Sequence, residues 1–217
     1  MRFHIITIFP EMFDSYLKES ILGRAIKDKK IKVKFYNPVA FCKPKERVDG
    51  RPYGGGPGMV IRPEPVLKAL SKIKFNKKTK VILLSPSGKK FNTAYAKQTA
   101  KKYTDVVIIS GRYEGIDARV GKICKSLSAS GGAENISIGD YVLTGGELPA
   151  MVLLDCISRQ IKGVLGKYES LEEERVSSSI VYTRPEILKY KNKNYRVPKV
   201  LLSGNHANIE KWKKSKK

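Results

Sequence analysis

Strand-type and helix-type segments alternate along the first 160 residues, and this alternation constrains the fold more than any other feature. Apolar and β-branched runs typical of buried strands occur at 2–8, 31–36, 80–84, 105–109 and 136–143. Apolar residues at helical spacing occur at 10–26, 63–73, 91–102, 116–126 and 147–161. Pro10 suits the first turn of its helix, where a missing N–H costs no hydrogen bond. The alternation predicts an α/β fold with a mostly parallel sheet.

The chain is long enough for one main domain and a short appendage. It has 217 residues, and single domains usually run to about 100–200. Residues 167–179 are charged and serine-rich without periodicity, which is typical of a linker. We therefore expect a main domain over 1–160, a linker over 161–180 and a C-terminal domain over 181–217. No apolar run approaches the roughly 18 residues of a membrane span, so we expect no membrane partner.

The charge and cysteine content narrow the class of protein. Lys and Arg exceed Asp and Glu by 43 − 20, giving a net charge of +23, which favours a phosphate-rich partner. A lysine-rich genome would also raise the charge, and charge alone does not separate an RNA enzyme from a ribosomal protein. Cys42, Cys124 and Cys156 are odd in number and widely spaced, so they support neither disulfides nor a zinc site. Since no export signal is visible at the N-terminus, we expect a cytoplasmic protein.

Three of the expected strands run into glycine-containing loops. Because ligands of open α/β sheets bind beyond the carboxyl ends of the strands, we expect these loops to form one pocket. None matches a G-x-G-x-x-G fingerprint between strand and helix, and Gly54–Gly58 lacks the following Lys and Ser/Thr of a P-loop. Dinucleotide and nucleoside triphosphate binding are therefore weakly supported. The loops are Leu84-Ser-Pro-Ser-Gly88, Gly111-Arg-Tyr-Glu-Gly115 and Ser137-Ile-Gly-Asp-Tyr141, the last continuing to Gly145-Gly-Glu-Leu-Pro149.

Five stretches of the sequence carry a resemblance to a known family. They are Tyr53-Gly-Gly-Gly-Pro-Gly-Met59, Gly111-Arg-Tyr-Glu-Gly115, the run from Ser137 to Met151, Tyr182-Thr-Arg-Pro185 and Leu201-Leu-Ser-Gly-Asn-His206. With these motifs the chain resembles the bacterial tRNA (guanine-N1)-methyltransferases over nearly its whole length. The run Ser137-Ile-Gly-Asp-Tyr-Val-Leu-Thr-Gly-Gly-Glu-Leu-Pro-Ala-Met151 is the most specific of them.

The resemblance implies a fold, a partner and an activity. It implies the SPOUT fold with a deep trefoil knot, a homodimer whose interface builds the active site, and a small helical C-terminal domain that grips the tRNA anticodon stem-loop. The implied reaction is methylation of guanosine N1 at tRNA position 37, next to the anticodon, with S-adenosylmethionine (SAM) as methyl donor. A Mg²⁺ requirement is also implied, although we expect no dedicated metal-binding residues.

The resemblance also implies which residues contact SAM. Glu114 matches an acidic position that the family associates with the cofactor pocket and with Mg²⁺. The expected contacts are Leu84, Ser85, Pro86, Gly111, Tyr113, Glu114, Ser137, Ile138, Gly139, Tyr141, Leu143, Gly145 and Pro149.

The chemistry of the implied reaction requires a base and a cation. Guanine N1 carries a proton at neutral pH, so a base must remove it while a cation or donors hold the charge that develops at O6. The resemblance assigns the cation to Arg159. The family's base is an aspartate in the linker, and here Glu174 stands at the corresponding position, with about four residues fewer before Tyr182. Glu173 or Glu172 could serve instead, or residues 172–174 could form a solvated charge run.

Two further features of the sequence concern RNA recognition: one departure from the family's acidic pair and the composition of the C-terminal tail. The family shows two adjacent acids before its Tyr-Gly-Gly-Gly stretch, whereas here Asp49 is followed by Gly50, so base selection could differ. Asn205 and His206 have either a helix-capping or an RNA-positioning role. The basic tail offers phosphate contacts and stacking, or it is a frayed terminus; it comprises Lys211, Trp212, Lys213, Lys214, Lys216 and Lys217. Two alternatives stay open: another SPOUT RNA methyltransferase, or a non-catalytic basic RNA-binding protein.

Overall fold

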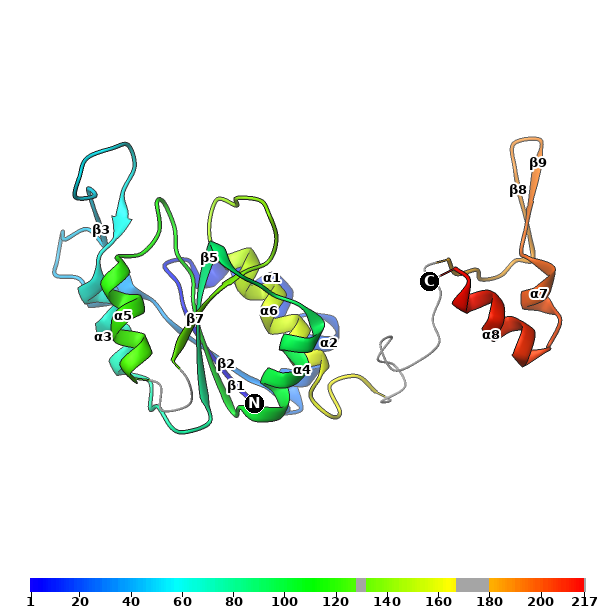
Figure 1. The fold of residues 1–217 in the computed structure, drawn as a ribbon, viewed down its shortest axis with the longest axis horizontal. Helices are drawn as coiled ribbons and strands as arrows, with labels where there is room; N and C mark the ends of the chain where they lie inside the picture. Colours follow the sequence, from blue (N-terminus) through cyan, green and yellow to red (C-terminus); the bar gives the residue numbers. More distant parts are fainter. Residues whose placement is uncertain (128–131, 167–179, 217) are drawn as a thin grey trace. The chain divides into compact units, whose positions relative to one another are not determined.

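The computed structural model describes residues 1–127, 132–166 and 180–216. The chain divides into two compact units, Met1–Leu165 and Gly166–Lys217, and the first contains a sheet with helices on both faces (Figure 1). This unit continues past residue 160 because Ile161 and Val164 pack against its core. Residues 167–179 of the expected linker lie outside the described residues.

A five-stranded sheet organises the first unit. Its strand order is β2-β1-β6-β5-β7, and every neighbouring pair is parallel. This confirms the prediction of an α/β fold with a mostly parallel sheet. The strands are β1 (Arg2–Ile6), β2 (Lys32–Tyr36), β5 (Thr79–Lys90), β6 (Asp105–Ile109) and β7 (Ala133–Ser137).

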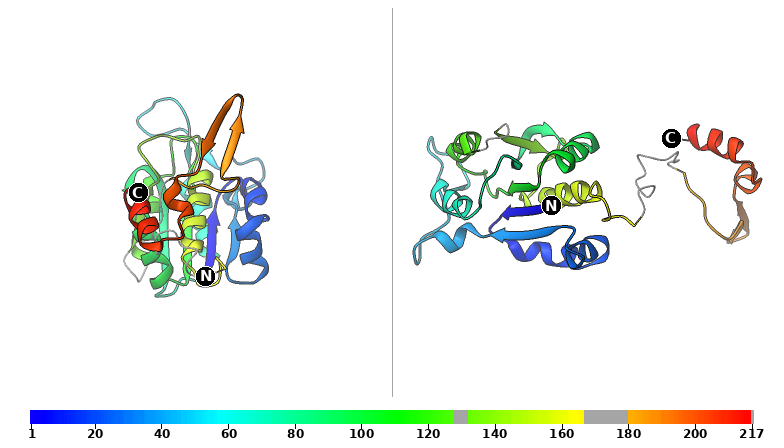
Figure 2. Two further views of the ribbon diagram at one scale, coloured as in Figure 1. Left: turned by 90° about the vertical axis from the view of Figure 1, so that its right-hand side faces the viewer. Right: turned by 90° about the horizontal axis from the view of Figure 1, so that it is seen from below.

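Both faces of the sheet are covered, so the strands are apolar on both sides. In β6, Val106 and Ile108 belong to one core cluster while Val107 and Ile109 belong to the other, as the two-residue repeat of a strand requires. Figure 2 shows the sheet between its two helical layers. One layer contains α1 (Asp14–Leu17), α2 (Ser20–Lys27), α4 (Thr93–Lys102) and α6 (Glu147–Arg159); the other contains α3 (Pro63–Ser71) and α5 (Ala118–Leu127).

Short elements complete the first unit. Two 3-10 helices, η1 (Pro10–Phe13) and η2 (Pro38–Phe41), follow the ends of β1 and β2. The strands β3 (Asp49–Gly50) and β4 (Val60–Ile61) pair antiparallel and enclose the glycine-rich segment between them.

Two of the expected elements are wrong in part. The expected strand at 136–143 ends at Ser137, because the Ser137 hydroxyl bonds both the amide and the carbonyl of Gly139 and turns the chain away from the sheet. The expected helix at 10–26 is broken, because Glu19 is extended and Ser20 adopts a φ of +51°. The spacing of apolar residues gives no sign of the turn after Ser137 or of the break at Glu19 and Ser20.

The strand β5 continues past the expected end at residue 84 through a bulge. Its pairing with β7 changes register between Leu84 and Lys89, so that residues 85–88 bulge out of the ladder. A Cβ atom on Gly88 would lie 2.5 Å from the Ile136 amide nitrogen, so this close approach requires glycine. The first glycine-containing loop is therefore a bulge within a strand.

The second unit combines a hairpin with two short helices, whereas the sequence predicts a helical domain. The strands β8 (Ile187–Tyr190) and β9 (Lys193–Arg196) pair antiparallel, and α7 (Lys199–Leu202) and α8 (His206–Lys214) follow. Asn205 caps α8 by accepting a hydrogen bond of 3.1 Å from the Asn208 amide. The rings of Tyr182 and Trp212 lie 6.3 Å apart. In the part of the chain that the structure describes, no helix combines the length and the apolar character needed to cross a membrane.

A buried hydroxyl in α6 gives a stability prediction. The Ser158 side chain is fully buried, and its Oγ atom has no hydrogen-bond partner among the described residues. A buried polar group without a partner costs about 1–3 kcal/mol, and alanine is the better helix former. We expect Ser158→Ala to raise the free energy of unfolding by about 1 kcal/mol, as measured by urea denaturation. Ser137→Ala, which removes a bonded hydroxyl, should lower it; a less stable Ser158→Ala protein would contradict the prediction.

Candidate active site

A pocket opens at the carboxyl edge of the sheet, where the β5 bulge and the segments after β6 and β7 meet. Its volume is about 570 Å³, within the range of roughly 300–1,000 Å³ typical of small-molecule sites. The segments that line it are the three glycine-containing loops of the sequence together with one face of α5.

The structure brings together nearly all of the residues expected to contact a cofactor. Gly139 does not line the pocket; a Cβ atom at this position would lie 2.2 Å from the Tyr141 ring, so this ring packs directly against Gly139. Whether the others bind a cofactor stays a prediction. The expected residues that line the pocket are Leu84, Ser85, Pro86, Gly111, Tyr113, Glu114, Ser137, Ile138, Tyr141, Leu143, Gly145 and Pro149.

One wall of the pocket comes from residues that the sequence analysis missed. The helix α5 contributes Gly121, Lys122 and Lys125, the last of these from its final turn, and the loop before α5 contributes Asp117. Asp117 Oδ1 accepts a hydrogen bond of 2.9 Å from the Arg119 amide, satisfying one of the unpaired amides at the helix start. A glycine within an otherwise amphipathic helix, next to a glycine-containing loop, is the signal that could have indicated this wall.

The loop Gly111–Gly115 forms a second wall in an unusual backbone conformation. Tyr113 adopts a φ of +59°, in the left-handed region that few residues other than glycine enter. The Glu114 amide donates to the Met59 carbonyl at 3.0 Å, and the Ile61 amide donates to the Gly115 carbonyl at 2.9 Å. These bonds tie the pocket to the end of the glycine-rich segment 51–59.

The segment before α6 lies directly against the backbone that follows β6. The Gly146 amide donates to the Gly111 carbonyl at 2.8 Å, and the Ser110 hydroxyl donates to the Gly146 carbonyl at 3.2 Å. A Cβ atom on Gly146 would lie 2.8 Å from the Ser110 Cα atom, so the contact admits only glycine. This contact joins two of the pocket's walls.

A buried ion pair holds the same two walls together. Arg112 Nε lies 2.9 Å from Glu147 Oε2, and the Glu147 side chain is 1% exposed. The Thr7 hydroxyl donates to the other Glu147 oxygen at 2.8 Å, and Arg112 Nη1 donates to the Thr144 carbonyl at 3.3 Å. The Arg112 guanidinium also stacks 4.8 Å from the centre of the Phe9 ring. Arg112 and Glu147 thus position the loop over the pocket, a role that the sequence analysis missed.

Arg159, one of the two expected catalytic residues, does not line this pocket. Arg159 is the last residue of α6, whereas Pro149, which lines the pocket, is in its first turn. Ten residues of helix separate them by roughly 15 Å. Glu172, Glu173 and Glu174 lie outside the described residues.

Arg159, which is half-buried, shares a face of α6 with exposed apolar residues. Leu148, Val152, Asp155 and Arg159 follow one another at helical spacing, and Leu148 and Val152 are exposed. Phe9, Met12 and Tyr16 add further exposed apolar surface from the neighbouring η1 and α1, and the Tyr16 hydroxyl donates to Asp155. Contiguous exposed apolar surface of this kind is typical of protein interfaces.

Asp49, the acidic residue before the glycine-rich segment, forms an ion pair with Arg47. The Arg47 guanidinium donates two hydrogen bonds to the buried Asp49 carboxylate, at 3.0 and 2.9 Å. At Gly50 an added Cβ atom would meet only the Arg62 side chain, at 3.9 Å, so a larger residue would fit. Among residues 1–127, 132–166 and 180–216, no three His, Cys, Asp or Glu side chains gather into a metal-ligating group.

The parallel sheet and its edge pocket define an α/β protein of the class that binds a nucleotide-sized ligand beyond the carboxyl ends of its strands. The family model described as tRNA (Guanine-1)-methyltransferase TrmD matches residues 1–217, and the chain belongs to this family.

Curated relatives agree with this membership. The tRNA (guanine-N(1)-)-methyltransferase of Pseudoalteromonas atlantica is 44% identical over 97% of this chain and 78% of its own length. The proteins of that name from Clostridioides difficile and Buchnera aphidicola are 44% and 46% identical, over 99% and 97% of this chain and 91% and 87% of their own lengths.

Proposed function

We propose that the protein transfers a methyl group from SAM to N1 of guanosine 37 in tRNA, next to the anticodon. The observation that carries the proposal is that three glycine-containing loops meet at one pocket, in a chain that belongs to the tRNA (Guanine-1)-methyltransferase family. The net charge of +23 is consistent with an RNA substrate.

The residues of the pocket fit SAM as the donor. Apolar side chains such as Leu84, Pro86 and Ile138 offer a surface for the adenine ring, and glycine backbone offers close hydrogen-bonding groups to its edge. Lys122 and Lys125 offer positive charge to the carboxylate of the donor. SAM supplies an electrophilic methyl group when bound, so the protein's own task is to hold the guanine in line with it and to manage one proton.

A linker glutamate would accept that proton, and Arg159 would stabilise the charge that its removal leaves on the purine. A carboxylate accepts the N1 proton, and a guanidinium near O6 stabilises the charge that develops on the purine. We assign the second role to Arg159 and the first to Glu174, with Glu173 and Glu172 as alternatives.

A homodimer would bring Arg159 to a pocket. Because Arg159 is roughly 15 Å along α6 from the pocket of its own chain, we propose that it acts at the pocket of the partner. The apolar face of α6, η1 and α1 is the surface we assign to the dimer, since Arg159 lies on the same face. The crossing of Gly146 over Gly111 is compatible with the deep trefoil knot of the SPOUT fold, which we propose for residues 1–160.

The C-terminal residues would hold the substrate. We propose that residues 181–217 bind the tRNA anticodon stem-loop and that residues 161–180 link them to the methyltransferase domain. If Mg²⁺ takes part, Glu114 is the carboxylate that would hold it, together with substrate oxygens; magnesium commonly binds in this way through one or two carboxylates.

Mapping the product tests the proposal. Purified protein should transfer the methyl group of labelled SAM to unmodified tRNA, and mass spectrometry of nuclease fragments should locate it at N1 of guanosine 37. A methyl group on another nucleotide would favour the alternative of a different SPOUT RNA methyltransferase. Failure to bind SAM in calorimetry would favour a non-catalytic RNA-binding protein.

A further inference from the structure

The hairpin of the second unit has two faces that its register defines. Residues directly opposite each other in an antiparallel pair share a face, and successive residues alternate. The pairs Leu188↔Tyr195 and Tyr190↔Lys193 therefore form one face, which we term the tyrosine face. The other face contains Ile187, Lys189, Asn194 and Arg196.

The tyrosine face is exposed. Leu188, Tyr190 and Tyr195 are 54%, 60% and 54% exposed, respectively, although all three are large and apolar or aromatic. An isolated two-stranded hairpin is only marginally stable in water, and apolar side chains on it gain stability when a partner covers them. The face therefore has the character of a binding surface.

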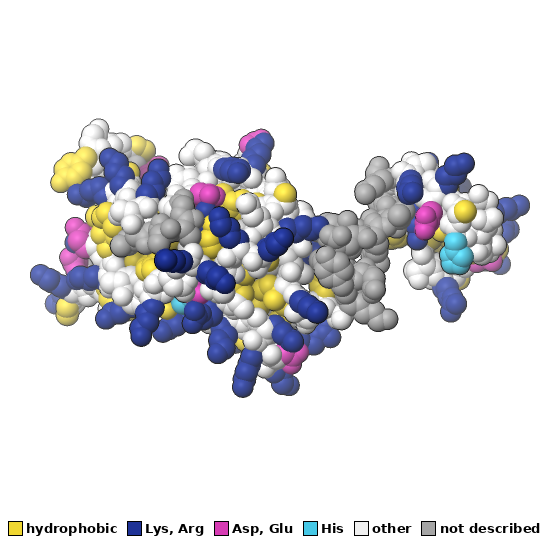
Figure 3. Space-filling view, turned by 60° about the horizontal axis from the view of Figure 1, so that its bottom comes forward, with side chains coloured by type: hydrophobic (Ala, Val, Ile, Leu, Met, Phe, Trp, Pro, Cys, Tyr) yellow, Lys and Arg dark blue, Asp and Glu magenta, His cyan; other side chains and the backbone are white. Residues whose placement is uncertain are grey.

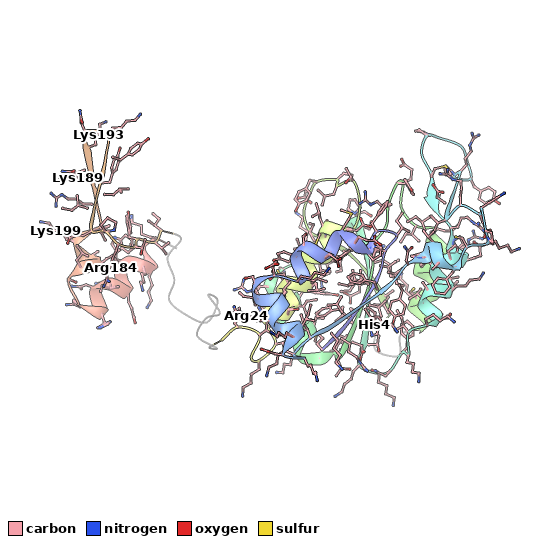
Figure 4. All side chains as sticks on the ribbon, turned by 180° about the vertical axis from the view of Figure 1, so that it is seen from behind. His4, Arg24, Arg184, Lys189, Lys193 and Lys199 are labelled. Atoms are coloured by element: carbon pink, nitrogen blue, oxygen red, sulfur yellow. The ribbon has the colours of Figure 1, made fainter. Side chains whose placement is uncertain are left out.

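The charge of the hairpin indicates what the partner is. Residues 187–199 contain five basic residues, Lys189, Lys191, Lys193, Arg196 and Lys199, and no Asp or Glu. Figure 4 shows Lys193 near the tip of the hairpin, Lys189 along it and Lys199 at its base. Figure 3 shows further Lys and Arg side chains on the second unit. Lysine is depleted at the cores of protein–protein interfaces, whereas closely spaced lysines are typical of contacts with phosphates.

We propose that the tyrosine face binds unpaired nucleotides of the RNA substrate, with bases stacked on Tyr190 and Tyr195 and with phosphates neutralised by the surrounding lysines. Exposed aromatic rings among cations are the usual platform for single-stranded RNA, because every base has a flat face and each stack adds affinity. The inference rests on the proposed function in one respect: it takes tRNA as the RNA.

Aromatic and apolar replacements separate stacking from simple burial. We expect Tyr190→Leu with Tyr195→Leu to raise the Kd for unmodified tRNA at least roughly tenfold, measured by fluorescence anisotropy, and to raise the KM for tRNA by a similar factor. Tyr190→Phe with Tyr195→Phe retains the rings and should stay within about threefold of the unaltered protein. Asn194→Ala on the opposite face is the matched control and should bind normally.

Measurements of SAM binding, kcat and salt dependence show whether a change in tRNA affinity comes from the tyrosine face. The Kd for SAM and the kcat at saturating tRNA should not change in the leucine variant, because the tyrosine face belongs to the second unit. Lys193→Ala should reduce the dependence of affinity on salt by about one phosphate contact. Unchanged tRNA affinity in the leucine variant would overturn the proposal. A change in the oligomeric state without a change in tRNA affinity would also overturn it, because the tyrosine face would then contact protein instead of RNA.

The anisotropy measurement does not depend on catalysis. If the unaltered protein binds tRNA but transfers no methyl group, the proposed function fails while the comparison of leucine and phenylalanine variants still supports or overturns the hairpin proposal. If methyl transfer occurs and the leucine variant binds tRNA normally, only the hairpin proposal fails.

Discussion

Replacing Arg159 with alanine is expected to lower kcat for methyl transfer by roughly 100- to 1,000-fold, the usual effect of removing a group that stabilises charge in the transition state. The Kd for SAM should stay unchanged, because Arg159 does not line the pocket of its own chain and the role assigned to it at the partner's pocket is toward the purine and not toward SAM. Single-turnover transfer from labelled SAM measures the first quantity and calorimetry the second. Arg24→Ala, at an exposed arginine of α2 (Figure 4), is the control and should retain kcat.

Mixed dimers test whether Arg159 acts at the partner's pocket. Gly121 lines the pocket, and a Cβ atom there would meet only Leu83 at 3.6 Å, so Gly121→Phe should fill the cavity without disturbing α5. Co-expressed Arg159→Ala and Gly121→Phe chains should regain activity in the mixed dimer, where an intact pocket meets an intact arginine from the other chain. If both variants are inactive and the mixture stays inactive, Arg159 does not act at the partner's pocket.

Replacing Asp105 with asparagine is expected to give the largest loss of stability in the first unit. The Asp105 side chain is 1% exposed at the amino edge of the sheet, where Arg2 Nε lies 2.6 Å from it and His4 Nε2 lies 3.2 Å from it. Thr104 and Asn76 donate further hydrogen bonds, at 2.8 and 3.3 Å. Removing one partner from a buried ionic network costs about 3–5 kcal/mol when charge is left unpaired; because Arg2 is largely exposed, we expect about 2–3 kcal/mol.

The Asp105 carboxylate also contributes to the loss of folding stability at acidic pH. Burial raises the pKa of Asp105, but hydrogen bonds from Arg2, Thr104, His4 and Asn76 outweigh it and lower the pKa from 3.8 to about 2. A lowered pKa stabilises the folded state above pH 3.8, and this stabilisation is lost as the pH falls from 3.8 to about 2. Asp105 should therefore account for roughly 2 kcal/mol of acid-dependent stability.

Urea denaturation at several pH values checks both statements. Asp105→Asn should be less stable at neutral pH and should lose less stability than the unaltered protein between pH 4 and pH 2, about the range in which Asp105 titrates. Asp14→Asn removes an exposed carboxylate that pairs with Lys18, the residue after α1, so it should change stability by less than about 0.5 kcal/mol. Equal decreases in the free energy of unfolding for Asp105→Asn and Asp14→Asn would show that the network around Asp105 contributes no more to stability than an exposed ion pair does.

Sequence patterns predicted the parallel sheet and most of the pocket because both depend on local signals. Runs such as 105–109 are apolar throughout, as strands covered on both faces must be, and glycine-containing loops after such strands meet at one edge. The interruptions were not predictable: the Ser137 turn and the β5 bulge depend on hydrogen bonds and register rather than on apolar periodicity.

Other features that the sequence analysis did not predict depend on the three-dimensional structure and not on local sequence patterns. The Arg112–Glu147 pair joins residues 35 positions apart, and neither residue differs locally from a solvated surface charge. The basic, tyrosine-containing segment at 187–196 has no buried residue, so its hairpin left no strong apolar signal. For Arg159 the sequence indicates a residue type and a motif, but only the length of α6 shows that its own pocket is out of reach.

The contact between Gly146 and Gly111 also bears on protein synthesis. The walls of the pocket come from three stretches of chain, and the last of them ends at Pro149. A nascent polypeptide released before that point has most of its sheet strands but no closed cavity. If the pocket binds its ligand as proposed, affinity is acquired only after Pro149 has been translated, so ligand binding would report a folded first unit and not the presence of the second.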